Sequence, residues 1–131
     1  MRNIKRTFLI ILPFLILATG CSIKQPKYNY ISKHSLVGVA SYYGEKWNGR
    51  TTANGEKLNI HAMTAAHKTL PFNSIVKVTL LSTGKSVNVR INDRGPYCNN
   101  RIIDLTDEAA KRLGIYNQGI GEVKLEILSK P

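Results

Sequence analysis

The stretch that most constrains the fold runs from Val87 to Asp104, V-N-V-R-I-N-D-R-G-P-Y-C-N-N-R-I-I-D. Its first half alternates, with Val87, Val89 and Ile91 on one side and polar residues on the other. This period of two predicts a strand with one buried face. The run Asp93-Arg94-Gly95-Pro96 then ends the strand, because Gly accepts positive φ and Pro cannot donate to a sheet.

Two acids are associated with this stretch. Asp93 stands where the first strand ends, and Asp104 lies in a second short apolar strand, Arg101 to Leu105. An acid at the end of a strand suits general acid–base chemistry, since strands hold a side chain more precisely than loops do. A turn aspartate that caps its own backbone explains the local sequence around Asp93 equally well. Both interpretations stay open at this level.

Residues 1–20 have the pattern of a bacterial export signal. A basic start, Arg2 to Arg6, is followed by an apolar run, Phe8 to Leu17, which is short for a transmembrane helix and contains Pro13. We therefore expect residues 1–20 to be a signal peptide of the lipoprotein type.

Small residues, Ala18-Thr19-Gly20, lead directly into Cys21. This arrangement predicts that Cys21 is acylated and anchors the protein to a membrane, with residues 21–35 as the lipidated cysteine and a linker. An ordinary cleaved signal with an incidental cysteine is the alternative. Lipidation of Cys21 leaves Cys98 without a partner in the chain, whereas a disulfide between the two is the other possibility.

Charge and residue types limit the partners. The sequence has 19 Lys plus Arg against 8 Asp plus Glu, and removal of residues 1–20 leaves a net charge of +8. A basic surface favours a polyanion, and for an exported chain the cell wall and anionic lipids are at hand. Nucleic acid is not expected, because dense basic runs and stacking motifs are missing from the sequence. The three histidines are scattered, so neither a metal site nor another cofactor is expected.

Residues 36–131 have the pattern of one folded domain. Alternating segments predict strands at Val37 to Tyr43, Ile75 to Leu81 and Gly121 to Leu128, and Ser82-Thr83-Gly84 predicts a hairpin turn. Gly38 within the first segment indicates a close approach of backbone.

One helix is expected, from Thr106 to Gly114. Thr106 can cap its start, acids follow in the first turn, bases stand in the last turn, and Gly114 ends it. Several short strands with one helix favour a small closed barrel, since an open sheet would leave long edges exposed.

The turn-rich segment 44–57 holds the only Trp, Trp47. Tyr42, Tyr43 and Arg50 lie close to it in sequence, and Glu56 follows. Aromatic rings mixed with arginine and asparagine suit a groove that stacks on sugars and hydrogen-bonds their hydroxyls. The alternative is that Trp47 is buried beneath the loop as part of the core.

Five ordered motifs together resemble the rare lipoprotein A family. They are G-V-A-S-Y-Y-G at 38–44, N-G-R-T-T-A-N-G-E at 48–56, T-A-A-H-K-T-L-P at 64–71, V-R-I-N-D-R-G-P at 89–96 and R-I-I-D-L-T at 101–106. The resemblance implies an all-β fold, a six-stranded double-psi β-barrel with one or two short helices. Asn73 stands where the family usually has Gly, and Asn tolerates the left-handed conformation.

The resemblance also implies a function. Members are lipid-anchored on the periplasmic face of the cell envelope, with the outer membrane favoured, and act as endolytic lytic transglycosylases in wall remodelling or daughter cell separation. Such an enzyme cleaves the bond between N-acetylmuramic acid and N-acetylglucosamine without water. The C6 hydroxyl attacks C1 and leaves a 1,6-anhydro ring, so one carboxylic acid can suffice where a hydrolase normally needs two.

Roles carry over to individual residues. The resemblance implies that Asp93 is the catalytic acid–base and that His67 and Glu56 are supporting site residues, with His67 bonding Asp93 or the sugar. We expect the glycan to be bound by Tyr42, Tyr43, Trp47, Arg50, Asn92 and Arg94.

Two other functions fit the same features. A non-catalytic, expansin-like peptidoglycan-binding lipoprotein would use the same groove, aromatic rings and charge. A structural lipoprotein that recruits wall or division proteins would need only the anchor and a binding surface. The joint presence of Asp93, His67 and Glu56 favours the enzyme.

Overall fold

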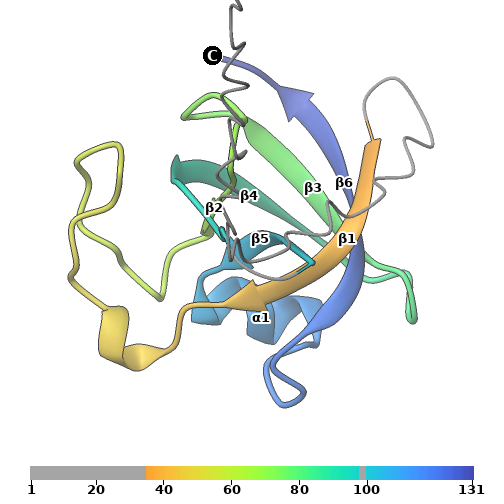
Figure 1. Cartoon of the computed structure of the whole chain (residues 1–131). Helices are drawn as coiled ribbons and strands as arrows, with labels where there is room; N and C mark the ends of the chain where they lie inside the picture. The colour runs from red at the N-terminus through yellow and green to blue at the C-terminus, as the bar shows by residue number, and fades with distance from the viewer. Residues whose placement is uncertain (1–34, 98–99) are drawn as a thin grey trace, which may run out of the picture.

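The computed structural model describes residues 35–97 and 100–131, and within them six strands close into a barrel in the order β1-β5-β2-β4-β3-β6 (Figure 1). The predicted all-β, six-stranded barrel is thereby confirmed. The expected signal peptide, Cys21, most of the linker and Cys98 lie outside the described residues. The strands are β1 (Ser35–Tyr42), β2 (Thr64–Ala66), β3 (Ile75–Leu80), β4 (Ser86–Asp93), β5 (Arg101–Leu105) and β6 (Gly121–Ser129).

Two of the strand pairs are parallel. Strand β1 lies parallel to β5, and β2 lies parallel to β4, while the remaining four pairs are antiparallel. Parallel neighbours require crossover connections, and here each parallel pair joins strands that are separated along the chain. The short β2 lies between β4 and β5 in the barrel. Its last residue, Ala66, pairs with Asp93 at the end of β4 and with Asp104 near the end of β5.

The alternating pattern of the sequence corresponds to the two faces of the barrel. The predicted hairpin pairs Val76 with Val89 and Val78 with Val87, and all four side chains are buried. Fully buried aliphatic side chains from all around the barrel fill its interior. Among the largest are Ile91, Ile103, Leu105 and Leu125.

The predicted helix is present as α1 (Asp107–Leu113), and a 3-10 turn, η1 (Glu45–Trp47), is the other short helix. The Thr106 hydroxyl accepts the Ala109 N–H at the start of α1, and Gly114 ends it with φ 94°. These caps satisfy backbone groups that a short helix would otherwise leave unpaired.

Two special backbone positions agree with the sequence analysis. A Cβ atom on Gly38 would lie 2.5 Å from Cγ2 of Ile102, so β1 and β5 can approach only because this residue has no side chain. Asn73 has φ 69°, the left-handed conformation expected of it.

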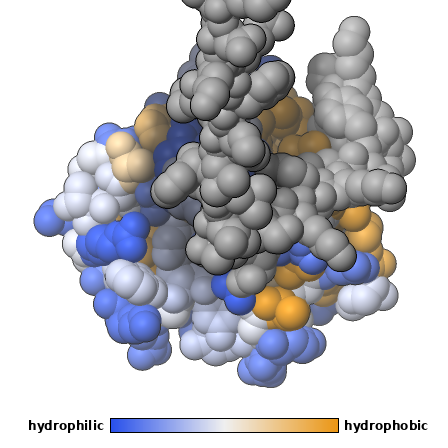
Figure 2. Space-filling view, in the orientation of Figure 1, coloured by the Kyte–Doolittle hydropathy of each residue, from blue (hydrophilic) through white to orange (hydrophobic). Residues whose placement is uncertain are grey.

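The segment between η1 and β2 projects from one side of the barrel (Figure 1). In the space-filling view this side is mostly hydrophilic, and hydrophobic residues gather on the opposite side of the same face (Figure 2). Among the described residues, no helix has the length and apolar character needed to span a membrane.

Candidate active site

The Asp93 carboxylate is fixed by three donors at the end of β4. The Tyr43 hydroxyl donates to Oδ2 at 2.8 Å, and the backbone N–H groups of Ala53 and Arg94 donate to Oδ1 at 2.9 Å each. Only 3% of Asp93 is exposed. Three separate segments of the chain therefore hold this carboxylate in one orientation.

Tyr43, which follows β1, is a permanent donor in this arrangement. Burial raises the pKa of its phenol far above the ordinary value, and the hydrogen bond to Asp93 and the charge of that residue act in the same direction. The hydroxyl thus keeps its proton at neutral pH and donates it to Asp93.

A cleft of about 360 Å³ opens over Asp93. This volume lies in the range of small-molecule sites. Of the six residues expected to bind substrate, five line the cleft, namely Tyr42, Tyr43, Trp47, Arg50 and Arg94. The cleft is also lined by Gly95, Pro96, Tyr97, Arg101 and Asp104, which were not among the predicted site residues.

The aromatic side of the cleft is open to solvent. Trp47 is 38% exposed, so it is no core residue, and the Arg50 guanidinium lies 5.0 Å from its ring centroid. Tyr42 stacks on Tyr116 with ring centroids 4.9 Å apart and donates its hydroxyl to the Tyr116 carbonyl at 2.9 Å. The exposed Trp47 ring suits contact with a sugar face, whereas the Tyr42 ring is stacked on Tyr116.

The Arg94 guanidinium turns away from the neighbouring carboxylate. Its centre lies 3.9 Å from the Phe72 ring centroid, and Nη1 donates to the His67 carbonyl at 3.2 Å. Only the backbone N–H of Arg94 reaches the Asp93 carboxylate. Arg94 thus lines the cleft without forming an ion pair with Asp93.

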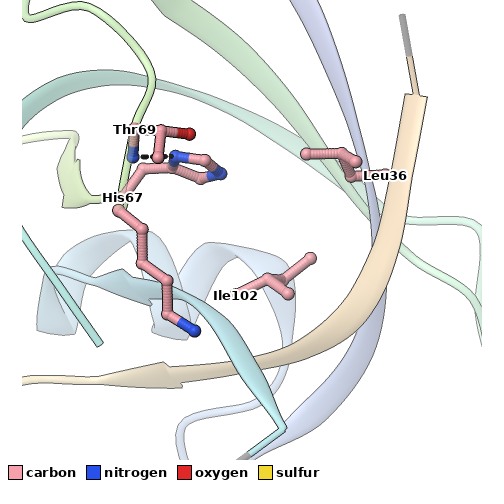
Figure 3. Close-up of a pocket in the computed structure, with 5 residues that line it drawn as sticks. Leu36, His67, Thr69 and Ile102 are labelled. Atoms are coloured by element: carbon pink, nitrogen blue, oxygen red, sulfur yellow. Dashed lines mark hydrogen bonds between the residues drawn. The ribbon is translucent and has the colours of Figure 1, made fainter. Parts of the chain in front are cut away.

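The His67 ring forms its hydrogen bonds outside this cleft. Nδ1 accepts the backbone N–H groups of Thr69 and Leu70 at 3.1 Å each, so the ring proton lies on Nε2. Figure 3 shows the other edge of the ring facing a hollow of about 230 Å³ that Leu36 and Ile102 also line.

The link between His67 and Asp93 is made by the backbone alone. The His67 N–H donates to the Asp93 carbonyl at 3.2 Å, whereas no hydrogen bond among the described residues joins the imidazole to the carboxylate. Burial lowers the pKa of His67 to about 4, and the charges of Arg94 and Lys68 add to this effect. The imidazole is therefore neutral at neutral pH.

Glu56 is held by an ion pair with Arg90 of β4. The Arg90 guanidinium donates to both carboxylate oxygens, at 2.6 and 2.9 Å, and the side-chain amides of Asn54 and Asn92 donate at 2.9 and 3.2 Å. The bonds to Arg90, Asn54 and Asn92 lower the pKa of Glu56 to about 2. Glu56 is thus ionised and does not line the cleft.

Asn92 is the expected substrate-binding residue that does not line the cleft. It is 2% exposed and directs its amide to Glu56, because successive residues of a strand point to opposite sides. The structure therefore places Asp93 together with five of the expected residues and places His67, Glu56 and Asn92 around them. The catalytic and binding roles themselves remain predictions.

A second carboxyl group, that of Asp104, lies in the same cleft. The Ser41 hydroxyl donates to its Oδ1, and burial raises its pKa above the ordinary value. In the sequence, Asp104 stands out as a lone acid inside the apolar strand R-I-I-D-L. In residues 35–97 and 100–131, no group of three His, Cys, Asp or Glu side chains is arranged to hold a metal ion.

Fold and cleft together define the class. This is a double-psi β-barrel protein with carboxyl groups at the floor of a cleft bordered by aromatic and arginine side chains. A family model described as lytic transglycolase, of the double-psi barrel type, matches residues 35–125. The chain belongs to this lytic transglycolase family.

Curated relatives carry related names. The chain is 56% identical over 91 residues to the probable endolytic peptidoglycan transglycosylase RlpA of Synechocystis, covering 70% of this chain and 28% of the relative. It is 55% identical over 93 residues to the Pseudomonas aeruginosa RlpA, covering 71% and 27%. It is 51% identical over 98 residues to the Neisseria meningitidis RlpA, and the match covers 75% of this chain and 41% of the relative. The chain thus spans between about a quarter and two fifths of these relatives' length.

Solved structures share the fold. A Streptomyces papain inhibitor has a TM-score of 0.58 at 20% identity, with 74% of this chain and 96% of that chain covered. A Clavibacter michiganensis expansin has a TM-score of 0.58 at 23% identity, with 74% and 52% covered. At such identities the likeness concerns the barrel only.

Proposed function

We propose that this protein is an endolytic lytic transglycosylase of peptidoglycan. It cleaves the bond between N-acetylmuramic acid and N-acetylglucosamine within glycan strands and leaves 1,6-anhydro ends, in wall remodelling or daughter cell separation. Membership of the lytic transglycolase family supports this activity, and so do the names of relatives that are more than half identical over the barrel.

One observation carries the proposal. Asp93 lies at the floor of an open cleft, and Trp47, Tyr42 and Arg50 line that cleft. The carboxylate is fixed by three donors, so its position is set before substrate arrives. A fixed carboxyl group beside sugar-binding rings is what proton transfer at a glycosidic bond needs.

The reaction requires two proton movements. The leaving oxygen of the cleaved bond must gain a proton, and the C6 hydroxyl must lose one as its oxygen attacks C1. Asp93 supplies the proton chemistry in this proposal, and such catalysis contributes about 10² to 10⁴ in rate. No water enters the product, because the substrate's own hydroxyl closes the ring.

The test compares the wild-type protein with Asp93→Asn on purified sacculi. We expect the wild type to release fragments with anhydro ends and Asp93→Asn to release none, with both proteins equally folded. Glu108→Gln on α1, where Glu108 pairs with Arg112, makes the same chemical change away from the cleft and should retain wild-type activity.

The products discriminate between the candidate functions. Anhydro ends identify a transglycosylase, and new reducing ends identify a hydrolase. Binding to sacculi without new ends identifies the expansin-like binder. Undiminished release by Asp93→Asn removes Asp93 from the catalytic role.

We also propose that the protein is anchored by lipid at Cys21 on the periplasmic face of the cell envelope. The apolar run followed by Ala18-Thr19-Gly20-Cys21 supports this proposal. Labelled palmitate should enter the wild type and Cys98→Ala but not Cys21→Ala. Equal labelling of wild type and Cys21→Ala contradicts the assignment.

A further inference from the structure

Strand β2 brings two carboxyl groups to one cleft. Ala66 pairs with Asp93 of β4 on one side and with Asp104 of β5 on the other. Neighbouring strands lie 4.7–4.9 Å apart, so the two aspartate backbones are within roughly 10 Å of each other. Both residues line the cleft. At this separation the charge of Asp93 raises the pKa of Asp104.

The two groups have different surroundings. Three donors converge on the Asp93 carboxylate, from Tyr43, Ala53 and Arg94. Donors of this kind bind the charged form of a carboxyl group, which has only acceptors. The only donor to the Asp104 carboxyl group among the described residues is the hydroxyl of Ser41.

The charges around Asp104 act in both directions. Burial has the largest effect and raises its pKa, while the Ser41 hydrogen bond and the charge of Arg101 lower it. The charge of Asp93 raises it further. The other ionisable residues that line the same cleft are Tyr42, Tyr43, Arg50, Arg94 and Tyr97. The net result is a pKa above the ordinary value, which favours the protonated form.

From this geometry we propose that Asp104 is the catalytic acid and Asp93 the catalytic base of the same reaction. This inference rests on the function proposed above, and it assigns to two residues the two proton movements that one residue would otherwise make in turn. Pairs of carboxyl groups whose surroundings differ in this way commonly divide acid and base roles.

The bond from C1 to the leaving oxygen breaks, and that oxygen takes the proton of the Asp104 carboxyl group. The C6 oxygen forms the new bond to C1, and its proton passes to the Asp93 carboxylate. Asp104 is then ionised and Asp93 protonated, and exchange with solvent through the open cleft restores both groups.

The test uses two substrates that differ in their leaving group. The first is peptide-free glycan, whose leaving oxygen needs a proton. The second is the dinitrophenyl glycoside of a peptide-free oligomer that ends in N-acetylmuramic acid, whose leaving group departs as a stable anion. Asp104→Asn should lower the rate on glycan by about 10² to 10⁴ and leave dinitrophenolate release near the wild-type rate. Asp93→Asn should lower both rates, because both reactions need the base.

Each other outcome overturns the assignment. Equal loss on both substrates by Asp104→Asn means that the residue is structural, and no loss on glycan means that it carries no proton. A wild type that forms anhydro ends while Asp104→Asn remains fully active refutes this inference alone. A wild type that forms none refutes the proposed function and this inference together.

A second measurement serves if Asp104→Asn does not fold. The wild-type rate on glycan should fall as pH rises and the acid loses its proton, and the rate on the dinitrophenyl glycoside should not fall with it. Ser41→Ala removes a hydrogen bond that lowers the pKa of Asp104, so the fall should move to higher pH. An unchanged profile in Ser41→Ala, or the same fall with both substrates, contradicts the acid role.

Discussion

The buried imidazole of His67 makes stability depend on pH. Its Nδ1 accepts two backbone N–H groups, and a proton there would break both bonds. Asn at this position keeps an acceptor near Nδ1, since its side-chain oxygen can reach the same amides, but it does not titrate in this range. We therefore predict that wild type loses stability on acidification relative to His67→Asn.

The size of the effect follows from the lowered pKa. The pKa of His67 is about 4 in the folded protein against 6.5 ordinarily, so between these values the unfolded chain binds more protons. The contribution of neutral His67 to the free energy of unfolding is fully present above pH 6.5 and is lost as pH falls through about 4. The loss from this residue amounts to about 2 kcal/mol at pH 5 and about 3 kcal/mol at pH 4, relative to neutral pH. His67 is only 6% exposed, so solvent screening reduces this value little.

Urea unfolding at constant ionic strength measures the effect at pH 7, 5 and 4. Other groups titrate over this range in both proteins, so the difference between wild type and His67→Asn isolates the imidazole. Replacement of the exposed His61 by Asn is the matched control and should leave the wild-type curve unchanged. Parallel curves for wild type and His67→Asn would refute the reasoning.

Three further predictions concern stability by urea unfolding at pH 7. Gly38→Ala should cost about 1–3 kcal/mol, because the new Cβ would meet Ile102, and adding Ile102→Ala should restore part of the loss. Thr106→Ala should cost about 1–2 kcal/mol, because it removes both the helix cap and the hydrogen bond that the hydroxyl donates to the Ala62 carbonyl, and Thr106→Ser should cost less. Glu56→Gln should cost only about 0.5–1 kcal/mol, since both partners of its ion pair with Arg90 are more than a third exposed. The Glu56 contribution is present above pH 4.5 and is lost as pH falls through about 2.

Three results would contradict these expectations. An unchanged Gly38→Ala would mean that the Ile102 side chain moves freely, and additive losses in the double variant would mean that the two residues are not in contact. Equal losses in Thr106→Ala and Thr106→Ser would exclude the cap. A loss at Glu56 that is insensitive to salt would exclude the ion pair as its cause.

The regular elements were predictable because their signals are local. Strand β4 follows the alternation from Val87 to Ile91, and α1 follows its capping residues. Strand β2 was not predicted, since Thr64–Ala66 is too short for any period and forms by pairing with strands that come later in the chain. Its identity as a strand is fixed by long-range pairing and not by its own residues.

The site was predictable in its composition but not in its arrangement. The turn-rich segment that contains Trp47 and Arg50 was expected to border a groove, and it does. Which way the His67 ring turns depends on two loop amides, and no sequence pattern records that choice. Asp104 joins Asp93 only because β2 lies between their strands, which is a property of the barrel topology.

The ion pair between Glu56 and Arg90 also helps to fix the loop that holds the Asp93 carboxylate. Arg90 and Asn92 both belong to β4 and both hold Glu56, while the same loop donates the Ala53 N–H to Asp93. Residues 53–56 are thus fastened at both ends to the strand that carries Asp93. This loop has little ordering entropy left to lose when the proposed glycan substrate binds, so its conformation and hydrogen exchange should be nearly the same with and without the glycan.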